Sequence, residues 1–183
     1  GGIGNTNDLP PQQKALAISE DLNGDGFQDV VIGTGGGNEH VYTLDGTDGS
    51  IIWQFGTDHP DSFGLGDITS VNTDEDFNND GIKDVLAAGS ATDGGLQGRR
   101  SVYCFNGPDG ALQWQFFVGS FIRSAVPIGD VNGNGHIDVV AGTGDGVSNT
   151  YSVVAIESSG PSGPTPIWSF PIGSTAGGGK DVI

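Results

Sequence analysis

The fold of this chain is decided by the stretch Asp21-Leu22-Asn23-Gly24-Asp25-Gly26-Phe27-Gln28-Asp29-Val30. Two further copies follow it, from Asp76 to Val85 and from Asp130 to Val139. The second copy begins 55 residues after the first, and the third begins 54 residues after the second. Such even spacing indicates a structural repeat, so the chain contains three similar units.

Each copy carries oxygen-bearing side chains at its first, third and fifth positions. A glycine at the sixth position permits the chain to curl, so that these side chains converge on one point. The seventh residue offers its backbone carbonyl, and the aspartate at the ninth position closes the shell. All of these donors are hard oxygens, which favours Ca²⁺ over zinc or copper, and also over Mg²⁺, which resists dehydration.

Charge repulsion supports the same interpretation. Three carboxylates about 4 to 5 Å apart repel each other by roughly 3 to 4 kcal/mol per pair at an effective dielectric constant near 20, and a divalent cation cancels most of this cost. The alternative is a set of Asx turns without an ion, because Asp, Asn and Gly are also common in ordinary turns. This alternative has more weight in the third copy, where Asn134 replaces an aspartate and only Asp130 and Asp138 are charged.

Composition and charge narrow the class of protein. The chain has 183 residues, a formal net charge of −17 and an apolar fraction of 34%. Its apolar residues fall in short runs between turn signals, which is typical of an all-β domain and not of a disordered chain. The excess of acid argues against nucleic acid as a partner, because contacts to phosphate require positive charge.

Other features bear on the cellular compartment. No apolar run is long enough to span a bilayer, and the N-terminus lacks a signal peptide, as expected of a processed or excised chain. Cys104 is the single cysteine, so it forms no internal disulfide and we expect it to be a buried strand residue. Calcium loops of low affinity work where calcium is millimolar, which indicates an extracellular or cell-surface location.

Strand and turn signals divide the chain, which we interpret as a single repeat domain or propeller segment. In the first unit, apolar runs at 16–18, 30–33, 41–44 and 51–55 are separated by short turns, which predicts one antiparallel sheet. Val30–Gly33 is unbroken in its hydrophobicity, which predicts burial on both faces. The expected boundaries are a connector at 1–14, four-stranded blades at about 15–57, 63–119 and 124–173, and the start of a fourth repeat at 174–183.

The units differ mainly in their loops. Insertions are expected at Asp58–Ser62, Ala91–Arg100 and Ser158–Pro166, whereas the strands keep their places. Insertions in loops between constant strands are usual for stacked repeats. The two ends of the chain also correspond, because Gly2-Ile3-Gly4 is similar to Pro171-Ile172-Gly173.

The combination of a strand, a D-x-N-x-D-G-x-x-D loop and a second strand resembles the FG-GAP or VCBS-type calcium repeat of integrin alpha-subunit propellers and secreted bacterial proteins. The resemblance implies a β-propeller in which a calcium loop joins the first two strands of each blade. It implies up to three Ca²⁺ ions, with these metal ligands: Asp21, Asn23, Asp25, the Phe27 carbonyl and Asp29; Asp76, Asn78, Asp80, the Ile82 carbonyl and Asp84; Asp130, Asn132, Asn134, the His136 carbonyl and Asp138.

A second resemblance lies in the turns before the tryptophans. Leu44-Asp45-Gly46-Thr47-Asp48-Gly49-Ser50-Ile51-Ile52-Trp53 is similar to the tryptophan-docking turn of quinoprotein-type propellers, and Phe105 to Trp114 repeats it. We interpret Trp53, Trp114 and Trp168 as packing between blades and not as cofactor contacts. The lone Cys104 rules out the adjacent-cysteine disulfide that is associated with many such enzymes.

Catalysis has little support in the sequence, since it contains no G-x-S-x-G elbow and no convincing pair of nucleophile and base. The first hypothesis is a non-catalytic, calcium-stabilised module that binds protein or glycan at a surface, for adhesion or scaffolding. The second is a structural subunit that assembles with copies of itself into a ring or an extracellular filament, because three blades do not close a propeller. The third is a fragment of a propeller enzyme, such as a quinoprotein or a lyase.

Overall fold

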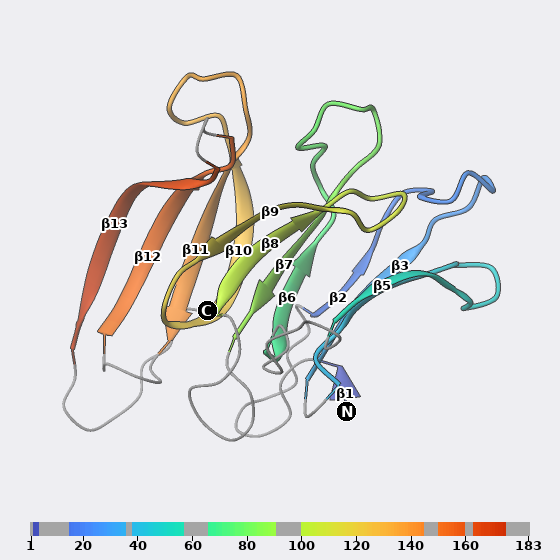
Figure 1. Ribbon diagram of the computed structural model, residues 1–183, viewed down its shortest axis with the longest axis horizontal. Coiled ribbons are helices and arrows are strands. Elements are labelled where there is room, and N and C mark those ends of the chain that lie inside the picture. The colour runs from blue at the N-terminus through green and yellow to red at the C-terminus, as the bar shows by residue number, and fades with distance from the viewer. Residues whose placement is uncertain are drawn as a thin grey trace.

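The chain folds into antiparallel β-sheets, as expected. The computed structural model describes residues 2–3, 15–35, 38–56, 66–90, 100–144, 150–159 and 163–174. Within these segments the strands form three separate sheets that follow one another along the chain, each corresponding to one predicted blade (Figure 1). Over this described part of the chain, no helix has the length and apolar character needed to cross a membrane.

Each blade is a meander in which consecutive strands pair with one another. The first contains β2 (Leu16–Ile18), β3 (Val30–Gly35), β4 (Val41–Leu44) and β5 (Ile51–Phe55). The second contains β6 (Ile68–Asn72), β7 (Val85–Gly89), β8 (Ser101–Phe105) and β9 (Leu112–Phe117). The third contains β10 (Phe121–Gly129), β11 (Asp138–Gly144), β12 (Thr150–Glu157) and β13 (Thr165–Ser174).

One short strand was not expected. β1 (Gly2–Ile3) pairs with β3, opposite Gly35 and Thr34, although the sequence places it in the connector. It lies along the same edge of β3 as β2, which pairs with the earlier residues of β3. The rest of the predicted connector, 4–14, most of the loops predicted at 58–62 and 91–100, and the predicted fourth repeat beyond 174 lie outside the described residues.

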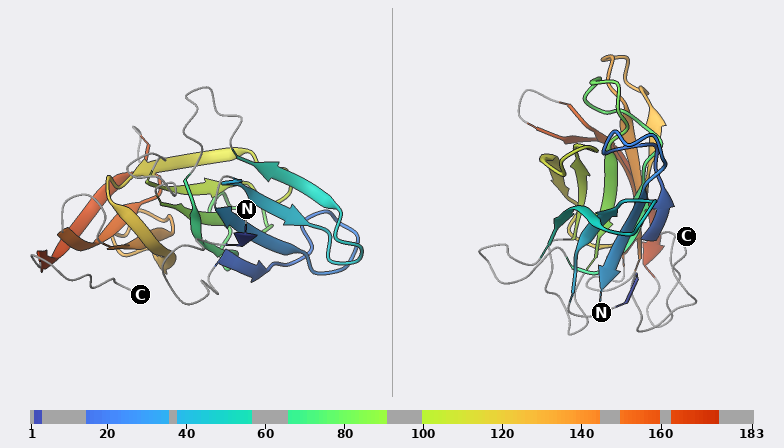
Figure 2. Two further views of the ribbon diagram at one scale, coloured as in Figure 1. Left: turned by 90° about the horizontal axis from the view of Figure 1, so that it is seen from below. Right: turned by 90° about the vertical axis from the view of Figure 1, so that its right-hand side faces the viewer.

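The three blades stand side by side along an arc, with the first and third at opposite ends (Figure 2). Apolar side chains fill the two spaces between neighbouring blades. One cluster joins the first blade to the second and includes Leu22, Val31, Trp53 and Phe105. The other joins the second to the third and includes Phe77, Leu86 and Ile156 together with Cys104. Stacking of blades therefore supplies the hydrophobic core, because one sheet alone has nothing on which to bury its faces.

Burial on both faces distinguishes the middle blade. Every residue of β7 and β8 is buried, since each of their faces meets a neighbouring blade. In the first four residues of β3 burial alternates instead, with Val31 fully buried and Val30 and Ile32 only partly so. The prediction that Val30–Gly33 is buried on both faces is therefore wrong for the single chain, because no blade precedes the first one within the described residues.

The tryptophans show the same dependence on a neighbour. Trp53 is 7% exposed and its indole Nε1–H donates a 2.7 Å hydrogen bond to the carbonyl of Gly107 in the next blade. Trp114 is half-buried and packs with the second cluster. Trp168 is 46% exposed, so the prediction of packing between blades holds for two tryptophans and is wrong for the third in this chain.

The position of Cys104 predicts its reactivity. Cys104 is fully buried and free, and this burial raises the pKa of its thiol, with a further contribution from the charge of Asp84. Because the thiolate is the reactive form, the native protein is expected to leave Ellman's reagent unreacted at pH 8. Unfolding in guanidinium chloride should then release one reactive thiol per chain. Rapid labelling of the native protein would contradict the buried position of Cys104.

Candidate metal centre

The three acidic loops join the first two strands of each blade and project from the same edge of the structure, at the top of Figure 1. Their chain path requires left-handed backbone at the fourth and sixth positions. Gly26, Gly81 and Gly135 at the sixth position have φ angles of 92°, 93° and 86°. Such angles favour glycine, which has no Cβ to clash. The predicted curl of the loop is thus present in all three copies.

The side chains at the first position hold the curl through backbone N–H groups. In the first loop, the Asp21 carboxylate accepts hydrogen bonds from Gly24 and Asp25 on one oxygen and from Gly26 on the other, at 2.6 to 3.1 Å. Asp130 accepts the same three bonds in its loop, and Asp76 accepts the two from the fifth and sixth residues of its own. These donors, above all Gly26, hold the pKa of Asp21 below its usual value. The carboxylate is therefore stabilised in its charged form.

The third and fifth positions form Asx turns with the residue two places on. Asn23 Oδ1 accepts the N–H of Asp25, and Asp25 Oδ1 accepts that of Phe27, at 2.9 and 2.8 Å. The same bonds recur in the second loop and in the third. A carboxylate offers about four acceptor sites, so one such bond leaves capacity for another ligand.

The aspartate at the ninth position has a role that the sequence did not reveal. Asp29, Asp84 and Asp138 are all fully buried. One oxygen of each accepts the backbone N–H of the second loop residue, at 2.8 to 2.9 Å. In the first two blades the other oxygen accepts the N–H of a turn glycine, Gly46 at 3.1 Å or Gly107 at 3.2 Å. This carboxylate therefore fastens the loop to the turn that follows the third strand.

Asp84 has the fullest set of partners. Besides Phe77 and Gly107, its carboxylate accepts bonds from the N–H of Asn78 and from the side-chain amide of Gln113, the latter at 2.7 Å. Burial nevertheless raises the pKa of Asp84, because loss of water disfavours the charged carboxylate more than these donors favour it.

In the third blade the corresponding carboxylate, that of Asp138, accepts fewer hydrogen bonds. Asp138 Oδ1 is buried, and within the described residues it has no hydrogen-bond partner. Between β12 and β13 the third blade has a longer segment, 158–164, where the first two blades have a short turn with its glycine. A buried carboxylate oxygen without a donor is costly, so this atom is available to a cation.

A second polar residue, here called the turn residue, reaches each loop from the place where the third strand ends and the turn begins. Asn23 donates its side-chain N–H to Asp45, Asn78 donates to Asn106, and Asn134 donates to Glu157, at 2.8 to 3.0 Å. Sequence reasoning missed these three residues. The available signal was their equivalent place at the end of the third strand: Asp45 and Asn106 directly follow β4 and β8, and Glu157 is the last residue of β12.

The donor chemistry fits a hard cation, but not one held by carboxylates alone. Within the described segments, no group of three or more His, Cys, Asp or Glu side chains is arranged to hold a metal ion. Amide and carbonyl oxygens, such as those of Asn23 and Phe27, are therefore needed to complete a shell. Such mixed oxygen sets suit Ca²⁺, which takes six to eight oxygen ligands in flexible geometry.

Comparison with known proteins identifies the repeats. Residues 15–53 match the FG-GAP repeat and residues 76–141 match an FG-GAP-like repeat, which together make up more than half of the chain. No curated protein matches the chain significantly. Among solved structures, rhamnogalacturonan lyase PL11 from Bacillus licheniformis is similar, with a TM-score of 0.53 and 15% identity. The similarity covers 86% of this chain but 34% of the lyase, so it bears on the fold alone.

The fastening role of the ninth position can be separated from metal binding. Asp84→Ala leaves buried backbone N–H groups without an acceptor, so it is expected to lower the free energy of unfolding by about 2–5 kcal/mol in calcium-free buffer. Asp80→Ala, in the same loop, removes two exposed bonds, the Asx-turn bond from Ile82 and one from the Asn78 side chain, and is expected to cost less than about 1 kcal/mol. Urea unfolding monitored by tryptophan fluorescence measures both. Equal losses in the two variants would contradict the fastening role.

Proposed function

The chain belongs to the FG-GAP repeat family, and on that premise we propose that it is a non-catalytic, calcium-stabilised β-propeller segment. The observation that carries this proposal is the threefold recurrence of one oxygen-rich loop at one edge of the structure. Each loop has the same curl, and in each the first-position carboxylate accepts the N–H groups of the fifth and sixth residues, although the residues around the loop differ. Three identical geometries in one chain favour a common ligand over three unrelated Asx turns.

The proposed ligands are the side chains at the first, third and fifth positions, the carbonyl of the seventh residue and the carboxylate at the ninth. When bound, the ion would supply positive charge that offsets repulsion among these carboxylates. The turn residues contribute to the same charge balance. Asp45 adds a carboxylate beside the first loop, whereas Glu157 adds one beside the third, where Asn134 lacks it. Glu157 thus compensates in part for the missing aspartate.

The role of the ion in this proposal is structural. The loop, the ninth-position aspartate and the neighbouring turn already form one hydrogen-bonded unit, and an ion in the loop would make this unit rigid. We place the protein outside the cell or at its surface, where free calcium is high enough to fill sites of low affinity. The net charge of −17 is consistent with a soluble surface module.

The proposed activity is binding or scaffolding, with a protein, a glycan or a further copy of the chain as partner. The similar lyase does not extend its own activity to this chain, because the likeness is limited to the fold and to about a third of that enzyme. Self-assembly is the second candidate function, and a specific observation favours it. The apolar faces of the first and third blades include exposed side chains such as Leu16 and Phe170.

Removal of calcium provides the main test. At a free calcium concentration 100 times Kd, each site contributes about 2.7 kcal/mol of stability. For a chain of this length that corresponds to roughly 5–10 °C in Tm per ion. EDTA is therefore expected to lower the melting temperature markedly, and calcium, but not an equal concentration of magnesium, is expected to restore it. A melting curve that EDTA leaves unchanged would show that the metal proposal is wrong.

The turn residues offer a test at the level of single loops. Asn106→Asp is expected to strengthen calcium binding in the second loop several-fold, because it adds the carboxylate that Asp45 supplies in the first. Glu157→Gln is expected to weaken binding in the third loop, since only two charged ligands remain there. Isothermal titration calorimetry of the two variants resolves these changes. Affinities that do not differ from those of the original chain would show that the turn residues take no part.

A further inference from the structure

In each of the first two blades, three positions pack against the blade that follows. They are the second residue of the acidic loop, the tryptophan of the outermost strand and the phenylalanine two places after it. In the first two blades these residues belong to the apolar clusters between blades: Leu22, Trp53 and Phe55, then Phe77, Trp114 and Phe116. We call this set of positions the donor face, because it carries the tryptophan that docks.

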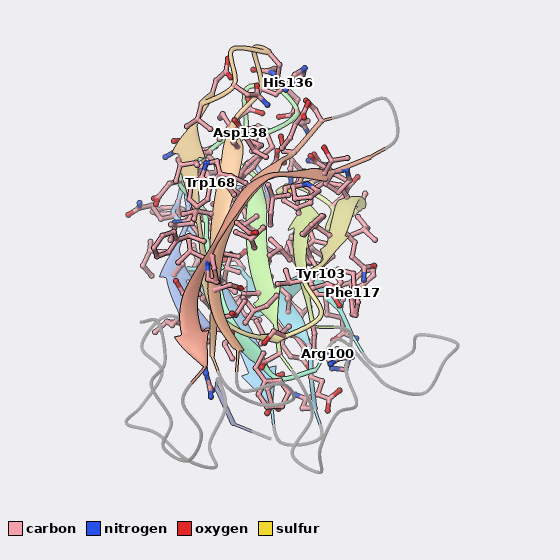
Figure 3. The ribbon with its side chains drawn as sticks, turned by 90° about the vertical axis from the view of Figure 1, so that its left-hand side faces the viewer. Arg100, Tyr103, Phe117, His136, Asp138 and Trp168 are labelled. Carbon is pink, nitrogen blue, oxygen red and sulfur yellow. The ribbon has the colours of Figure 1, made fainter. Side chains whose placement is uncertain are left out.

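The donor face of the third blade is uncovered. Its members are Val131, Trp168 and Phe170, and these side chains are 50%, 46% and 63% exposed. Figure 3 views the molecule from this side and labels Trp168 on the outermost strand. The residue types are those that the first two blades bury, so their exposure reflects the lack of a covering blade within the described residues.

The surface that accepts a donor face is formed by the first strand and the turn after the third strand. In the second blade, Val71 is 8% exposed and the turn is covered by Trp53 of the first blade, whose ring lies 2.5 Å from an ideal Cβ built on Gly110. The carbonyl of Gly107 in this turn accepts the indole N–H of Trp53. We call these elements the receiving face.

The receiving face of the first blade is preformed and uncovered. Leu16, at the position of Val71, is 50% exposed, and Ile18 is 59% exposed. The turn has the geometry of its occupied counterpart: Gly49 has a φ of 75° against 71° for Gly110, and the N–H of each donates a 2.8 Å bond across the turn, to the carbonyl of Asp45 or of Asn106. An ideal Cβ on Gly49 meets nothing within 4 Å.

We propose that the donor face of one chain packs on the receiving face of a second copy, so that Trp168 docks on the turn that contains Gly46 and Gly49. The indole N–H of Trp168 would donate to the carbonyl of Gly46, as that of Trp53 does to Gly107. The occupant is a copy of this chain because the two uncovered faces are the two halves of an interface that the chain already makes between its first and second blades. This proposal rests on self-assembly, the second candidate function above, and specifies the contact that would produce it. It does not depend on bound calcium.

The geometry of this contact determines the kind of assembly. The two faces lie on different blades at opposite ends of the arc, so the contact is head to tail and not symmetric. Head-to-tail contacts produce closed rings when the rotation closes and filaments when it does not. A single chain thus has one donor face and one receiving face, and each can be blocked separately.

The test uses the 183-residue chain in calcium buffer, with sedimentation velocity over a range of concentrations. The original chain is expected to form species larger than a monomer as concentration rises. Trp168→Glu on the donor face and Leu16→Glu on the receiving face are each expected to weaken association roughly 30-fold or more, as truncation of an interface hot spot does. Leu112→Glu, at a 42% exposed position of the middle blade, is the matched control and is expected to associate like the original chain.

Mixing the two end variants identifies the orientation of the contact. Trp168→Glu keeps its receiving face and Leu16→Glu keeps its donor face, so an equimolar mixture is expected to give a species of twice the 18.6 kDa chain mass and nothing larger. Failure of the mixture to associate would overturn the head-to-tail contact. A chain that stays monomeric up to its solubility limit would overturn self-assembly altogether and assign the two faces to further repeats or to another partner.

The outcome of this association test is independent of the proposal that the loops bind calcium. Association that persists while EDTA leaves the melting curve unchanged would support the contact between copies and remove the calcium role. Loss of association in the end variants without any change in their melting temperature would confirm that the exposed faces act between chains and not within them. Circular dichroism of each variant verifies that the sheets are intact.

Discussion

In the first two blades, a buried carboxylate at the start of the second strand holds the acidic loop, the strand and the turn together. Asp29 and Asp84 lie where water cannot reach them, so both of their oxygens need donors from the protein. The donors come from two places, the second residue of the acidic loop and the glycine of a turn 17 or 23 residues further on. The loop can therefore present its exposed acids in a fixed arrangement, because its far end is fastened inside the sheet.

Stacking determines which apolar residues are buried. β7 and β8 lie in the middle blade and are buried on both faces, whereas the equivalent strands of the first blade are buried mainly on the face toward the second. Trp53 and Trp168 occupy equivalent places with the same local sequence pattern, yet one is covered and the other is not. Burial in a repeat protein is thus a property of the neighbouring unit as much as of the residue itself.

The strands were predictable from sequence because their signals are local. Short apolar runs between Gly- and Asp-rich turns located β4 and β5 at their observed bounds, Val41–Leu44 and Ile51–Phe55. The contacts of Asp45, Asn106 and Glu157 with the loops were not predictable, since they join residues 22 to 28 positions apart whose proximity depends on the finished sheet. β1 was missed because Gly2 and Ile3 carry no strand pattern of their own and depend on the free edge of β3. The exposure of Trp168 could not be predicted from its residue type, because tryptophan normally packs against other residues.

The acidic loops and the faces between blades are parts of one structural unit. The first, third and fifth loop positions face solvent, while the second residue, Leu22 or Phe77, is buried against the next blade. The backbone N–H of that second residue is held by the buried aspartate. An ion bound on the outer side of the loop would therefore stiffen the residue that packs on its inner side. In the third blade this residue is Val131, which lies on the uncovered donor face. A rigid third loop would therefore hold Val131 in place and lower the entropy cost of binding a partner there.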